Sequence, residues 1–71
     1  MTTGMLWHDA SRDTLENKVI KAMSYYIKKY GVTPDLCLVH TFDYVKGDFI
    51  ITVRPYKGIV KNHLWIGVED E

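Results

Sequence analysis

Four polar side chains with the means for acid–base chemistry lie at or near the ends of predicted strands. They are two histidines, an aspartate and an arginine: His40, Asp43, Arg54 and His63. An acid, a base and an anion-binding group are the parts of a general acid–base site, provided that the fold brings them together. The alternative is that polar residues simply stand where a small sheet reaches solvent. Because the sequence has no G-x-S-x-G, phosphate-binding glycine loop or H-E-x-x-H motif, a small enzyme is the third functional hypothesis, with no catalytic residue assigned.

Cys37 and His40 have the C-x-x-H spacing found in some metal sites. On a strand, however, residues three apart point to opposite faces, so these two side chains would not bind one ion. The leucines on both sides of Cys37 predict a buried and unreactive thiol. As the only cysteine, it excludes a disulfide within the chain and a cysteine-rich zinc site. We therefore predict no metal and no cofactor.

Basic residues form two groups that suit a nucleic acid. Four lysines share the outward face of a predicted helix: Lys18, Lys21, Lys28 and Lys29. The second group brackets a loop that also holds Tyr56: Arg54, Lys57 and Lys61. Lysines bind phosphates and an aromatic ring among them can stack on an unpaired base, so a nucleic-acid-binding accessory protein is the second hypothesis. Against it, lysine is common on any solvated helix, and the pI of 6.8 is far from that of a basic domain.

The elements that must position these side chains begin with an amphipathic helix over 14–30. Apolar residues recur there with a period near 3.6, and the lysines occupy the opposite face. Asp13 is the predicted N-cap, and Glu16 three residues later would complete a capping box. Gly31 suits the left-handed residue that ends many helices.

Three strands are predicted after the helix, over 36–40, 49–53 and 64–68. The first is apolar on both faces, which predicts a central place in the sheet. The second is rich in β-branched residues, and Pro55 should end it because proline cannot donate to a ladder. Residues 5–7 are predicted to form either a short extra strand or an unpaired arm.

The 71 residues form one predicted domain of the α+β class. One amphipathic helix should pack on a three- to four-stranded, mainly antiparallel sheet as a two-layer sandwich. Residues 1–10 are the arm or edge strand, and the acidic tail 69–71 is expected to fray. Because we find neither a secretory leader nor a membrane-length apolar run, the expected location is cytoplasmic, with no membrane partner.

The leading functional hypothesis follows from the two faces of this sheet, since one helix covers only one of them. Side chains expected on or near the other face are the candidate interface: Trp65, Ile50, Val39, Tyr44 and Tyr56. An apolar surface of this kind usually marks an interface, and a second copy would enlarge a small core. We therefore predict a non-catalytic binding domain that forms a homodimer through the sheet face or edge. The alternatives are that loops 41–48 and 55–62 fold over this face together with the arm, or that another protein binds it.

The stretch from Ala22 onward resembles small uncharacterised prokaryotic or phage proteins. The resemblance covers about two-thirds of the chain and rests on these residues: Tyr25-Tyr26, Lys29-Tyr30-Gly31, Pro34, Leu36-Cys37, Val39-His40, Arg54-Pro55 and 62–68. It implies a small stand-alone domain and no particular activity.

Overall fold

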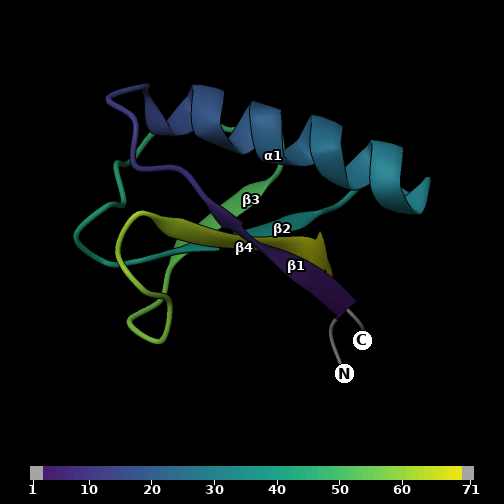
Figure 1. Ribbon diagram of the computed structural model, residues 1–71. Helices are drawn as coiled ribbons and strands as arrows, with labels where there is room; N and C mark the ends of the chain where they lie inside the picture. The colour runs from purple at the N-terminus through teal and green to yellow at the C-terminus, as the bar shows by residue number, and fades with distance from the viewer. Residues whose placement is uncertain (1–2, 70–71) are drawn as a thin grey trace.

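The computed structural model describes residues 3–69, which form one helix packed on one sheet (Figure 1). In chain order the elements are β1 Thr3–His8, α1 Leu15–Tyr30, β2 Leu36–Val39, β3 Thr52–Pro55 and β4 His63–Val68. This is the predicted α+β class with its two layers. No helix within the described residues is long and apolar enough to cross a membrane.

The sheet has four strands in the order β1-β4-β2-β3. β4 pairs antiparallel with β1 on one side and with β2 on the other, whereas β2 and β3 run parallel. The sheet is therefore mainly antiparallel, and β2 is central, as its apolar sequence predicted. Residues 3–8 form an edge strand that pairs with β4. Of the two predictions for this segment, the extra strand is therefore confirmed and the unpaired arm is wrong.

β3 begins later than predicted. The sequence indicated a strand over 49–53, but the parallel ladder runs only from Leu36↔Thr52 to Val39↔Pro55. Residues 49–51 nevertheless alternate as a strand would, because Phe49 and Ile51 pack against the core while Ile50 is 74% exposed. Pro55 is the last residue of the strand, as expected.

The helix and its N-cap each lie one residue later than predicted. Thr14, in an extended conformation, is the N-cap, and its hydroxyl accepts a 3.1 Å hydrogen bond from the Asn17 N–H. The predicted box of Asp13 and Glu16 is wrong because Asn17, three residues after Thr14, takes the place of the glutamate. Gly31 ends the helix with a φ of 70°, as expected.

The core lies between α1 and the two central strands. The helix contributes a stripe of four side chains, and β2 and β4 contribute alternate residues: Val19, Ala22, Met23, Tyr26, Cys37, Val39, Leu64 and Ile66. Tyr44, Phe49 and Ile51 pack against the same cluster. The long segment between β2 and β3 thus runs on the helix side of the sheet, beside α1 (Figure 1), rather than over the opposite face.

The end of the chain is tied to the sheet at Glu69. Its N–H donates a 3.0 Å hydrogen bond to Asp35, and its carboxylate lies 3.7 Å from the Arg54 guanidinium. Of the tail 69–71 that was predicted to fray, Glu69 makes these two contacts, and residues 70–71 lie outside the described part of the chain.

Removing one methyl group under the helix should destabilise the protein measurably. Ile66 is completely buried, so Ile66→Val should lower the free energy of unfolding by about 0.5–1.5 kcal/mol. The matched control is Ile50→Val, which removes the same methyl from a residue that is 74% exposed and should change the free energy by less than about 0.5 kcal/mol. Urea unfolding of both variants measures the difference, and equal effects would contradict the placement of the core.

Candidate functional site

The sheet face opposite α1 has no helix packed on it within residues 3–69. Because Met5, Trp7, Val53 and Val68 pack toward the core, their strand neighbours point the other way. The resulting open face consists of these strand residues: Gly4, Leu6, His8, Leu36, Leu38, Thr52, Arg54, His63, Trp65 and Gly67. None of them is acidic. The open face is therefore apolar and imidazole-rich, with one guanidinium.

The Trp65 ring lies over Gly4 on the open face. A Cβ on Gly4, in the neighbouring strand β1, would overlap the indole ring, so the ring occupies the space above that glycine. In the sheet register, Trp65 stands between Leu6 of β1 and Leu38 of β2. The half-buried Trp65 ring is thus a large apolar group at the surface of the open face.

The three histidines of the chain gather at one end of the open face. His8 and His63 are register partners, and their ring centroids are 4.7 Å apart. Continuing the β2–β4 register by one residue brings His40 next to His63. His63 donates from Nδ1 to the Lys61 carbonyl, whereas His40 Nδ1 accepts from the Phe42 N–H. Within residues 3–69, no three His, Cys, Asp or Glu side chains are arranged to hold a metal ion.

A cavity of about 420 Å³ lies on the other side of the sheet, between the start of α1, the 43–49 segment and β4. Val39, Leu64 and Phe49 are among its apolar lining residues. Its polar lining includes Asp43, whose carboxylate accepts a 2.7 Å hydrogen bond from the Asn62 N–H.

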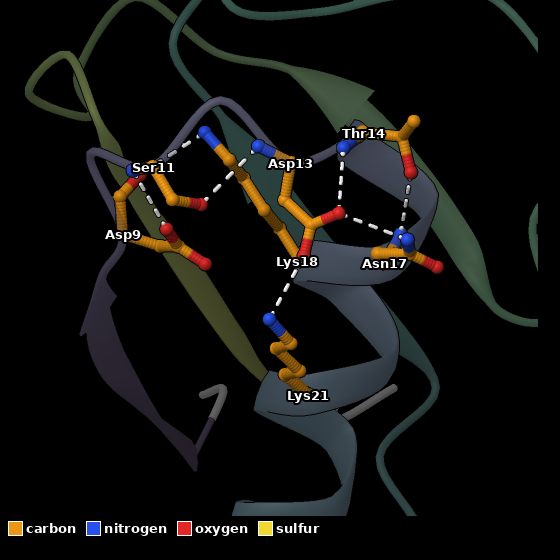
Figure 2. Close-up of polar contacts among 7 residues, drawn as sticks. All are labelled: Asp9, Ser11, Asp13, Thr14, Asn17, Lys18 and Lys21. Carbon is orange, nitrogen blue, oxygen red and sulfur yellow. Dashed lines mark hydrogen bonds and ion pairs between the residues drawn. The ribbon is translucent and has the colours of Figure 1, made fainter.

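Two further carboxylates of this cavity, Asp9 and Asp13, belong to a network that fastens the start of the helix (Figure 2). Asp9 accepts a hydrogen bond from the Ser11 N–H, and hydrogen bonds with this residue lower the pKa of Asp9. Asp13 lies 2.8 Å from the Lys21 ammonium and also accepts from the Asn17 amide. The bond to Lys21, followed by that to Asn17, lowers the pKa of Asp13 to about 2. These acids are thus held as carboxylates by partners that anchor α1.

The predicted acid–base group is divided by the fold. Asp43 and His63 both contribute to the lining of the cavity. His40 instead stacks with Phe42, and Arg54 extends toward Glu69. The fold brings the two histidines near each other at the end of the open face, but it does not join all four residues in one site.

The predicted nucleic-acid contacts are also divided. The helix lysines belong to the layer opposite the open face, where Lys21 is paired with Asp13 and Lys18 donates to the Asp9 carbonyl. Arg54 lies on the open face, and Lys57 and Lys61 follow it in the connection to β4. A single ligand surface could therefore use only one of the two basic groups.

The predicted interface residues do not form one patch. Trp65 is on the open face and Tyr56 follows β3 directly, but Tyr44 and Ile50 line a shallow hollow beside the start of β3. Val39 was misplaced, because its side chain is completely buried under the helix. The prediction failed since β2 is apolar on both faces, and such a strand does not indicate which residues face the helix.

Cys37 is buried in the core, as expected, and burial raises the pKa of its thiol to about 12. Sequence reasoning missed Leu6, His8 and Phe42 as surface residues of interest. If residues 3–8 are taken as a strand, the alternation of side chains places Leu6 and His8 on the face opposite their inward neighbours, and this pattern would have identified both. Phe42 follows β2, and no local pattern indicated its 82% exposure.

Comparison with known proteins adds no functional information, since no protein-family model, curated protein or solved structure matches the chain.

The contact between Gly4 and Trp65 can be tested by adding one methyl group. Gly4→Ala would place that methyl inside the indole ring, so the ring or β1 must move, and we expect a loss of about 1–3 kcal/mol in unfolding free energy. Gly47→Ala is the control, because its Cβ would meet nothing closer than Phe49 at 4.0 Å. Urea unfolding and the NMR shift of the Trp65 indole report the effect. An unmoved Trp65 signal with unchanged stability would contradict the contact between Gly4 and the Trp65 ring.

The Asp13–Lys21 pair should give the protein a distinct acid sensitivity. Since the pKa of Asp13 is lowered from 3.8 to about 2, its contribution is present above pH 3.8 and is lost as the pH falls toward 2. Lys21→Met should raise the pKa of Asp13 toward 3.8, as followed by carboxyl NMR. Lys28→Met, a lysine later in α1, is the control and should leave that pKa unchanged. If both variants titrate like the wild type, Lys21 is not the cause of the shift.

Proposed function

We propose that the protein is a non-catalytic binding domain that works as a cytoplasmic homodimer, paired through the outer edge of β1. The observation that carries this proposal is the character of that edge. β1 is six residues long, lies at the end of the sheet, and contains neither proline nor a Lys, Arg, Asp or Glu residue. Such an edge is a template for another strand.

The backbone groups available on this edge can be identified from the ladder. The Asp9 N–H donates to the Asn62 carbonyl at 2.8 Å, which continues the β1–β4 register. Because hydrogen-bonded pairs alternate in an antiparallel ladder, the N–H and C=O groups of Gly4, Leu6 and His8 point away from β4. Of these three residues, Leu6 and His8 carry their side chains on the open face.

The opposite edge of the sheet, formed by β3, is better protected against pairing with another strand than the β1 edge is. β3 has only four residues, ends in Pro55 and carries the charged Arg54. Short length, proline and charge are the features that discourage edge-to-edge pairing. The two edges therefore differ in their capacity to accept a strand, which favours β1.

Pairing of two β1 strands about a two-fold axis at Leu6 would place the outward N–H and C=O groups of the two copies opposite each other. In antiparallel register, Leu6 meets the same residue of the second copy, and Gly4 meets His8. Leu6, now 58% exposed, would become buried, while Tyr25, packed on Trp7 at the helix side, lies beside the same edge and is 48% exposed. The result is a continuous eight-stranded sheet with an enlarged apolar surface.

Light scattering behind size exclusion, over a range of protein concentrations, tests the dimer. Leu6→Lys would place two ammonium groups opposite each other at the axis, so the variant should be a monomer at concentrations where the wild type is a dimer. Val60→Lys is the control, since Val60 is 64% exposed and lies between β3 and β4. A wild-type monomer at every concentration, or a dimer that Leu6→Lys leaves intact, would refute the proposal.

A further inference from the structure

One end of the open face has a charge pattern that suits a polyanion. The segments 36–42 and 53–65 contain no Asp or Glu, and between them they carry three residues with permanent positive charge: Arg54, Lys57 and Lys61. His40 and His63 belong to the same segments. The Arg54 guanidinium is 3.7 Å from Glu69, and both side chains are about half exposed, so a phosphate can compete for it.

Two exposed aromatic rings accompany these cations. Tyr56 is 53% exposed, and its ring lies against Gly58, where a Cβ would approach it to 2.5 Å. Phe42 is 82% exposed, and its ring stacks with His40 at a centroid distance of 5.3 Å. The Lys61 ammonium lies 5.5 Å from the Phe42 centroid. Each ring is thus held by a local contact while much of its surface faces solvent.

The backbone brings the two rings to the same end of the sheet. The Tyr56 N–H donates to the Val39 carbonyl at 2.7 Å, and this bond belongs to the parallel pairing of Val39 with Pro55 that ends the β2–β3 ladder, so Tyr56 directly follows the last pair. This register sets Tyr56 beside His40, which stacks with Phe42. Tyr56, His40, Phe42 and Lys61 consequently form one surface, named here the aromatic–basic end.

We propose that the aromatic–basic end binds single-stranded nucleic acid. Aromatic rings close to cations suit unpaired bases and the phosphates that join them, whereas an apolar protein surface would leave Lys57 and Lys61 without partners. A duplex fits less well, because its bases are already stacked and α1 lies on the other side of the sheet, where it cannot enter a groove from this face (Figure 1). Asp43, the carboxylate that follows Phe42, is held by the Asn62 N–H and lines the cavity on the helix side.

This site is independent of the proposed dimer. The aromatic–basic end belongs to β2, β3 and the connection to β4, while the paired edge is β1, at the other side of the four-stranded sheet. Loss of the dimer in Leu6→Lys should therefore leave binding to each protomer in place, and loss of binding in a variant of the aromatic–basic end should leave the dimer in place.

Fluorescence anisotropy with a labelled oligothymidylate and an oligouridylate, each of about 12 nucleotides, tests the proposal at low and moderate salt. Binding should weaken as salt rises. Lys61→Glu and Tyr56→Ala should each weaken it about tenfold or more, and Tyr56→Phe, which keeps the ring, should retain it. The matched control is Lys28→Glu, which makes the same charge change on an exposed lysine of the helix layer and should have little effect. Circular dichroism confirms that each variant is folded.

Three results would overturn the proposal. Absence of binding to both oligonucleotides at low salt would assign the surface to a protein partner. Equal binding of a duplex of the same length would show that phosphates alone are recognised. An effect of Lys28→Glu as large as that of Lys61→Glu would move the contact to the helix lysines.

Discussion

The structure depends on the central position of its last strand. β4 hydrogen-bonds to β1 on one side and to β2 on the other, and its inward residues Leu64 and Ile66 are buried under α1. β1 and β2 do not pair with each other, so β1 joins the sheet only through β4. Both proposed surfaces follow from this arrangement. It leaves β1 at an edge, and it aligns residues from distant parts of the sequence across the open face.

A single helix on four strands creates a second constraint, which the chain meets without a second layer. On the open face, Leu36 is only 4% exposed although it lies outside the main core cluster. The Trp65 ring covers Gly4, so one large side chain shields part of the sheet that a second helix would otherwise cover. What remains exposed is divided between the apolar β1 edge at Leu6 and the aromatic–basic end. A small domain thus keeps a stable core and still has two chemically different surfaces.

Sequence reasoning recovered what depends on local pattern and missed what depends on pairing. The helix, its glycine end and the inward residues of β4 follow from periodicity and capping chemistry, which act within a few residues. Even there, the N-cap is Thr14 and not Asp13. Either residue type can fill that position, and the backbone hydrogen bond from the Lys18 N–H to the Thr14 carbonyl makes Thr14 the cap. The arrangement of the candidate site residues was predicted less accurately. His40 and Arg54 were expected to converge, but strand order and register, which no local signal encodes, send Arg54 toward Glu69 and His40 toward Phe42.

The two proposed surfaces would reinforce each other in one assembly. Pairing of β1 about Leu6 would join two open faces into one, and the two-fold axis would place the aromatic–basic ends at opposite sides of the eight-stranded sheet. One protomer measures 28 × 22 × 21 Å, so each proposed binding end alone would contact only a few nucleotides and should bind them weakly. Two ends on a rigid sheet can engage a longer strand together, since the second contact becomes intramolecular once the first has formed. Dimerisation would therefore supply affinity that a protomer of this size does not have, without adding a single residue to the binding site.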